Sequence, residues 1–178
     1  MPKHRLNPRE EAAWRGFNEM RTLLVARVSR DLLTQSGLTE ADYSVLLAVV
    51  ESPGRVIHSK ALLRRLQWEP SRLSHQLTRM ESRGTISRTR SEADARSFEV
   101  ALTDAGLRAI REATPEHFAA VRRWFVEVLT DAQLDSLAEI AQAVARHVAA
   151  VDAEEASACD GEEASACDSE EASACDSD

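Results

Sequence analysis

The chain has 178 residues, of which 43% are hydrophobic and 4% aromatic, enough apolar content for one folded body with its own core. Alanine, leucine and valine supply most of that content, which favours helices over an all-β fold. No apolar run approaches the ~20 residues that cross a bilayer, and the first ten residues carry charges and two prolines where a secretory signal would be apolar. We therefore expect a cytoplasmic protein without a membrane partner.

The net charge of −8 hides an uneven distribution. Residues 152 to 178 hold eleven acidic residues and no basic one, so the rest of the chain has 22 basic against 19 acidic residues, a charge of +3. Residues 52 to 102 hold ten basic and five acidic residues, a charge of +5. A locally positive segment suits a polyanionic partner such as DNA, whatever the total charge of the chain.

Apolar residues at helical spacing predict a first long helix over residues 8 to 35, and Gly37 is suited to end it. Thr39 and Asp42 resemble a capping box, which predicts a short apolar helix that continues to residue 50.

Two more short helices are predicted, one capped by Ser59 and running to about residue 67, the other from Pro70 to residue 83. Beyond them apolar and polar residues alternate at 86 to 90 and again at 98 to 102, around a polar turn, which predicts a β-hairpin.

Thr103 and Asp104 can cap a further helix, which Pro115 either kinks or restarts, and Thr130 with Gln133 can cap the last one. The predicted order is a long helix, three short helices, a hairpin and two long helices. This order indicates a mostly α (α+β) fold: a winged helix-turn-helix with flanking long helices.

The fourth helix carries the strongest functional signal. Leu73, Leu77 and Met80 form a narrow apolar stripe, and the rest of its surface is hydroxyl-bearing, amide or cationic. Such side chains hydrogen-bond to phosphates and to base edges in the major groove, as a recognition helix requires. The alternative is an ordinary solvated helix, since many exposed helices have a similar polar composition.

The hairpin strengthens the DNA-binding interpretation. Arg88, Arg90 and Arg96 lie in or beside its loop, where long cationic side chains can reach an adjacent minor groove. Asp94 is close enough in sequence to brace Arg96 by an ion pair, the alternative being a loose surface pair worth well under ~1 kcal/mol.

Several stretches between residues 37 and 110 together resemble one family. They are Gly37-Leu38-Thr39 with Tyr43-Ser44-Val45-Leu46, Leu62-Leu63-Arg64-Arg65-Leu66, the run from Ser71 to Gly84, and Asp94-Ala95-Arg96 followed by Leu102-Thr103-Asp104-Ala105-Gly106. The Asp-x-Arg element followed by Leu-Thr-x-x-Gly is the most specific of these. The sequence resembles the MarR (multiple antibiotic resistance regulator) family of winged helix-turn-helix transcription regulators.

The resemblance implies a homodimer that binds a pseudo-palindromic operator in double-stranded DNA and is released by a small, often aromatic, effector. It implies an N-terminal dimerisation helix (1–36), a winged helix-turn-helix (37–103) and C-terminal dimerisation helices (104–151). Residues 152–178 form an acidic repeat without large apolar side chains, and this composition predicts a disordered tail. It also implies DNA contacts from Ser59, Lys60, Ser71, Arg72, Ser74, His75, Gln76, Arg79, Arg88, Arg90 and Arg96, with Asp94 as the brace.

Other features of the sequence suggest alternative functions. Trp68 is either a core wedge or, more weakly, a contact for an aromatic effector. All three cysteines, Cys159, Cys167 and Cys175, lie in the acidic repeat, eight residues apart, and do not converge on a metal by themselves. A protein-interaction module and a metal- or redox-responsive tail remain the alternatives. Because no catalytic motif is found, we expect no enzyme, no cofactor and no metal site.

Overall fold

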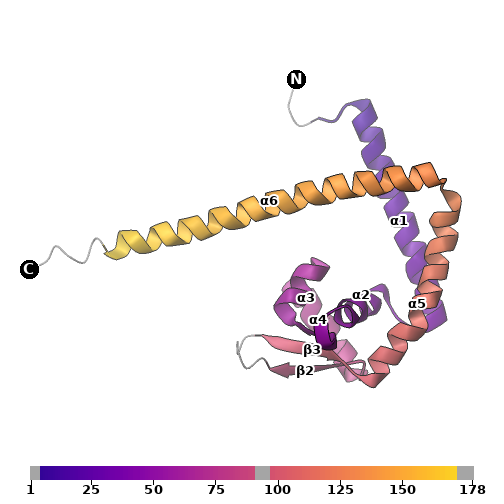
Figure 1. The fold of residues 1–178 in the computed structure, drawn as a ribbon, viewed down its shortest axis with the longest axis horizontal. Helices are drawn as coiled ribbons and strands as arrows, with labels where there is room; N and C mark the ends of the chain where they lie inside the picture. Colours follow the sequence, from indigo (N-terminus) through magenta and orange to yellow (C-terminus); the bar gives the residue numbers. More distant parts are fainter. Residues whose placement is uncertain (1–4, 91–96, 172–178) are drawn as a thin grey trace, which may run out of the picture. The chain divides into compact units, whose positions relative to one another are not determined.

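A computed structural model describes residues 5–90 and 97–171, with side chains described through residue 154. The chain divides into two compact units, Met1–Val128 and Leu129–Asp178. In chain order the elements are α1 (Pro8–Ser36), α2 (Glu40–Val50), a 3-10 turn η1 (Pro53–Arg55), β1 (Val56–His58), α3 (Ser59–Leu66), α4 (Pro70–Ser82), β2 (Ile86–Arg90), β3 (Phe98–Leu102), α5 (Asp104–Trp124), a 3-10 turn η2 (Val126–Val128) and α6 (Asp131–Glu171) (Figure 1).

Local signals set the ends of α1 and α2. Asn7 caps α1 in a capping box with Glu10, and Gly37 ends the helix at φ 71°, a conformation that glycine adopts without steric strain. Thr39 caps α2, and its side chain and that of Asp42 satisfy each other's backbone N–H groups, as the sequence predicts. The structure confirms both helices.

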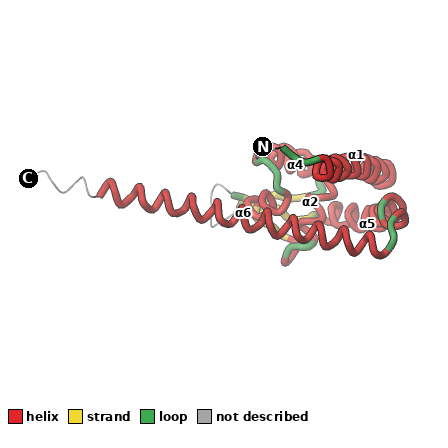
Figure 2. Tube along the Cα trace, turned by 90° about the horizontal axis from the view of Figure 1, so that it is seen from above, coloured by secondary structure: helices red, strands yellow, loops and turns green. Residues whose placement is uncertain are grey.

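The hairpin is also confirmed, and it belongs to a three-stranded antiparallel sheet with the order β1-β3-β2. Ile86 pairs with Leu102 and Arg90 with Phe98, while β1 adds to the other edge of β3 through Ile57 opposite Val100. β1 could not be predicted from the sequence, because three residues are too few to show an alternating pattern. Figure 2 shows how short these strands are beside the helices.

The core of the first unit lies around α2, which contacts α3, α4, α5, β1 and β3. Its fully buried side chains come from both helices and strands and include Leu46, Leu62, Leu77, Ile86 and Val100. In Figure 1, α2, α3 and α4 gather beside the hairpin, and α1 runs along α5. This packing holds one face of α4 against the core and leaves the other exposed.

The first turn of α5 packs directly on Gly84 and Thr85, which connect α4 to β2. Thr103 caps the helix by accepting a hydrogen bond from the N–H of Gly106, and its hydroxyl donates to the carbonyl of Gly84 at 2.6 Å. A Cβ on Gly106 would lie 1.9 Å from the carbonyl oxygen of Thr85. Gly106, the glycine of the Leu-Thr-x-x-Gly motif, therefore lies too close to the main chain of Thr85 to carry a side chain without a shift.

α5 continues through Pro115 as one helix, so the proline does not restart it. The indole N–H of Trp124, near its end, donates to Asp31 of α1 at 2.6 Å, and the guanidinium of Arg27 lies 4.3 Å from the centre of the Trp124 ring. These contacts join α1 to α5 by polar as well as apolar interactions.

The second unit contains α6. Thr130 and Gln133 form the predicted capping interactions at its start, with Thr130 N–H donating to Gln133 Oε1 at 2.9 Å. Ile140, Val144 and Val148, at four-residue spacing, are all at least half exposed. The helix extends to Glu171, into the acidic repeat for which the sequence predicts disorder. Glutamate and alanine, which recur in each repeat, are strong helix formers.

Candidate nucleic-acid interface

α4 presents the polar surface that the sequence predicts. Leu73, Leu77 and Met80 are buried, with exposed fractions of 4% or less. Between residues 71 and 79 of the helix, the exposed residues are Ser71, Arg72, Ser74, His75, Thr78 and Arg79. Pro70 occupies the first turn, where its missing N–H leaves no helical hydrogen bond unmade.

Gln76 is a correction to the predicted set. Its side chain is 2% exposed, and its Nε2 donates to Asp42 Oδ1 at 2.6 Å, so it cannot reach a base from this position. Residues 73, 76, 77 and 80 follow the spacing i, i+3, i+4, i+7 of a core-facing helical stripe. That spacing places Gln76 inside, but its amide chemistry led the sequence analysis to assign it to the polar face.

Asp42 is the centre of a buried polar network that links α2 to α4. Its carboxylate accepts hydrogen bonds from the Thr39 N–H (3.1 Å) and hydroxyl (2.7 Å), from Gln76, and from both terminal nitrogens of Arg83. Burial by itself would raise the pKa of Asp42, but the hydrogen bonds from Arg83 and Thr39 outweigh it and hold the pKa below its ordinary value. The sequence analysis had identified Asp42 only as a helix cap.

Arg72 is held at the N-terminal end of α4 by an aromatic platform. Its guanidinium lies 4.3 Å from the centre of the Trp68 ring, which is half-buried and packs on the core. A cation stacked over indole gains about 0.5–1 kcal/mol at an exposed site. Trp68 therefore packs against the core and also supports Arg72 of α4.

The arginines predicted in or beside the hairpin loop differ from one another. Arg90 is exposed at the end of β2, where the sequence predicts a minor-groove contact. Arg88 instead forms an ion pair with Glu81 of α4, its Nε donating to the carboxylate at 2.8 Å, and this bond lowers the pKa of Glu81. Arg88 therefore fastens the hairpin to α4. Asp94 and Arg96 lie outside the described residues.

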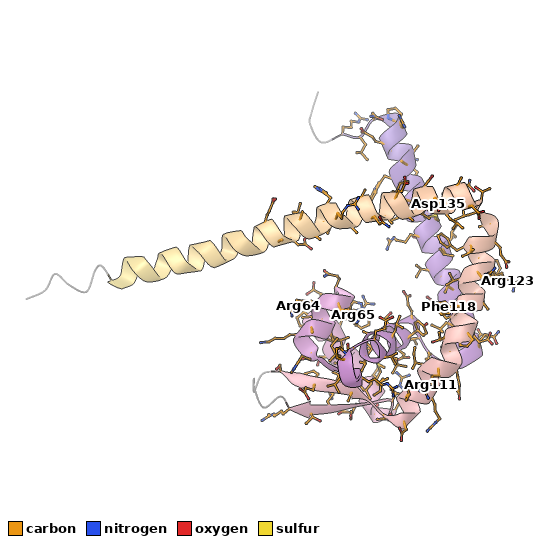
Figure 3. The ribbon with its side chains drawn as sticks, viewed as in Figure 1. Arg64, Arg65, Arg111, Phe118, Arg123 and Asp135 are labelled. Carbon is orange, nitrogen blue, oxygen red and sulfur yellow. The ribbon has the colours of Figure 1, made fainter. Side chains whose placement is uncertain are left out.

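Ser59 and Lys60 lie in the first turn of α3, as predicted, and Lys60 is exposed. The expectation that Ser59 caps α3 is wrong, because the helix already includes it and the cap position belongs to His58. The hydroxyl of Ser59 accepts instead from the N–H of Phe98 at 3.3 Å, which ties α3 to β3. Arg64 and Arg65 extend from the same helix (Figure 3), and Arg65 pairs with Glu51, which directly follows α2.

Proteins of known sequence and structure are similar to this chain. A family model described as transcriptional regulator SarA/Rot matches residues 27–113. The transcriptional regulator HosA of Escherichia coli is 31% identical over 101 residues, which are 57% of this chain and 73% of HosA. The crystal structure of AbsC, a MarR family transcriptional regulator from Streptomyces coelicolor, matches with a TM-score of 0.75 and 35% identity over 82% of this chain and 98% of AbsC. The chain belongs to the MarR family.

A second MarR family regulator from Streptomyces coelicolor, Sco3205, was solved in complex with DNA. It matches this chain with a TM-score of 0.74 and 34% identity over 80% of this chain and 89% of its own. The match spans most of Sco3205 and accords with the winged helix-turn-helix expected from the sequence.

This MarR family member also has an apolar cavity of about 220 Å³ between α1, α2 and α5. Its wall includes Leu24 and Val28 of α1, Tyr43 of α2, and His117 of α5, whose ring lies 4.5 Å from that of Tyr43. Burial lowers the pKa of His117, against a smaller opposing effect of Glu40. The sequence alone does not indicate this position for His117, because no local pattern connects it to Tyr43, 74 residues earlier in the chain.

Proposed function

We propose that this protein binds a pseudo-palindromic operator in double-stranded DNA as a homodimer and responds to a small aromatic effector. The observation that carries the proposal is the exposed face of α4. It holds two arginines, a histidine and three hydroxyl side chains on a helix whose opposite face is fixed in the core. That combination suits insertion into a major groove.

The dimer is supported by apolar side chains that no other part of the described chain covers. On α1, Trp14 and Leu23 are at least 60% exposed, as is Phe118 of α5 (Figure 3). On α6, Ile140 and Val144 continue the pattern. Large apolar side chains concentrated on the three long helices are what a second copy of the chain would bury.

The cavity between α1, α2 and α5 suits the effector. An apolar cavity of about 150 Å³ can hold benzene, so about 220 Å³ accommodates a single aromatic ring with small substituents. The buried Nδ1 of His117 has no hydrogen-bonding partner within the described ranges, 5–90 and 97–171. A hydroxyl or carboxyl group on the ring would supply one. Trp68, the weaker sequence candidate, does not line this cavity.

The decisive experiment is selection of bound duplexes from a random pool, followed by affinity measurements on the best site and on a scrambled one. We expect a two-fold-symmetric site. Arg79→Ala should weaken binding to that site by about 1–3 kcal/mol and leave the scrambled duplex nearly unaffected, if Arg79 contacts a base. Arg111→Ala, which removes the same charge from the exposed surface of α5, is the matched control (Figure 3). No preference among duplexes would contradict the proposal and favour a protein-interaction module.

A further inference from the structure

A chain of hydrogen bonds leads from the buried interior to the exposed face of α4. Gln76 is its middle member: its Nε2 donates to Asp42 Oδ1 at 2.6 Å, and its Oε1 accepts from Arg79. Asp42 and Gln76 are 1% and 2% exposed, whereas Arg79 is an exposed residue. Buried Gln76 therefore contacts the side chain that the proposed function places against DNA, and buried Asp42 is connected to that side chain through Gln76.

The negative charge of Asp42 sets the direction of these hydrogen bonds. A carboxylate only accepts hydrogen bonds, so it binds the NH₂ end of the Gln76 amide. The carbonyl oxygen of the amide must then point the other way, toward a guanidinium, which only donates. An amide at position 42 could instead donate to Gln76 and turn its side chain, so that an NH₂ group would face Arg79.

The carboxylate of Asp42 is itself fixed. Oδ2 accepts from the N–H and hydroxyl of Thr39 at 3.1 and 2.7 Å and from Nη1 of Arg83 at 3.2 Å, and Oδ1 accepts from Arg83 as well as Gln76. These partners come from the cap of α2 and from the C-terminal end of α4. The carboxylate cannot rotate without breaking several of these bonds.

We propose that Asp42 is a positioning residue for DNA recognition, which does not touch DNA but directs the Arg79 guanidinium through Gln76. The inference rests on the proposed function, in which the exposed face of α4 binds DNA. The bond to Gln76 uses one of the five N–H groups of Arg79 and leaves the others for a base. An arginine held in place before binding loses less rotamer freedom when it binds, so affinity for the correct site rises.

The test is a double-mutant cycle on the full-length protein, with affinity measured on the selected operator and on a scrambled duplex. Asp42→Asn should weaken operator binding about tenfold in the wild-type background. In the Arg79→Ala background the same change should have less than about a twofold effect, because the side chain through which Asp42 acts is gone. A general structural effect of Asp42→Asn would weaken binding by the same factor in both backgrounds, and that result would overturn the proposal.

Gln76→Leu provides a second measurement that does not disturb the Asp42–Arg83 ion pair. It should show the same dependence on Arg79, and it decides the question if Asp42→Asn fails to fold. Glu51→Gln is the matched control, since it removes an acidic partner of an arginine at the other end of α2 and should leave operator affinity unchanged. If the wild-type protein prefers no duplex, the proposed function fails and this inference with it. If it has a preferred site and the effects are additive, this inference alone fails.

Discussion

Gly106 lies in the first turn of α5, and replacing it with alanine tests the packing of that helix on the winged unit. Helix propensity alone predicts that the alanine stabilises the protein by about 1 kcal/mol. The added Cβ, however, would lie 1.9 Å from the carbonyl oxygen and 2.9 Å from the carbonyl carbon of Thr85, both main-chain atoms. Because an ordinary carbon–oxygen contact is about 3.3 Å, the main chain would have to move by more than ~1 Å.

That movement would disturb the hydrogen bond from the Thr103 N–H to the Thr85 carbonyl, 3.3 Å long. Overpacking against a rigid neighbour costs up to about 3 kcal/mol and a lost hydrogen bond about 1 kcal/mol. After the gain in propensity, we expect Gly106→Ala to lower the free energy of unfolding by about 2–3 kcal/mol, a fall in Tm of about 5–10 °C.

Urea unfolding followed by far-ultraviolet circular dichroism measures this change. Gly16→Ala is the matched control: Gly16 also lies within a helix, but an added Cβ there meets nothing within 4 Å. The control should stabilise the protein by up to about 1 kcal/mol. If Gly106→Ala were as stable as the control, the close-approach explanation of this glycine would be refuted.

Three further predictions concern the network, the wing and the dimer. Because the pKa of Asp42 is lowered in the folded protein, its ion pair with Arg83 stabilises fully above the ordinary value of 3.8 and is lost as the pH falls through the folded pKa. Asp42→Asn should therefore lower the unfolding free energy by about 3 kcal/mol at neutral pH, with a smaller difference below about pH 4; an equal loss at both pH values would contradict this. Arg90→Ala should weaken binding to all duplexes alike and reduce the slope of log affinity against log salt by about 1, whereas a sequence-dependent loss would indicate base contact. Val144→Asp should shift the sedimenting species toward the monomer while Gln142→Asp, on the opposite face of α6, should not.

The decrease in the free energy of unfolding at low pH has more than one source. Glu81 also has a lowered pKa, because of its bond to Arg88, and the lowered pKa of His117 means that the folded protein prefers a neutral imidazole. For His117 the stabilisation is complete above its ordinary pKa of 6.5 and decreases as the pH falls toward the folded pKa. We therefore expect Asp42→Asn to reduce the pH dependence of unfolding without abolishing it.

The sequence by itself determined the elements whose signals are local. Thr39 and Asp42 are three residues apart, and Gly37 directly follows the helix that it ends, so the order of residues was enough to predict these boundaries. The hairpin and the apolar stripe of α4 follow from periodicities of two and of about 3.6 residues. From these features the winged fold, the family and the exposed face of α4 could be predicted.

Only the tertiary structure decided which polar side chains are buried and what they contact. Gln76 and Asp42 are 34 residues apart, and the ring contact of Tyr43 with His117 spans 74. No helical or strand period encodes such distances. An amide on a mostly polar helix has the same local sequence whether it faces water or a buried carboxylate. The distinction arises only when α2 packs against α4, since burial then requires each polar group to find a partner from another element.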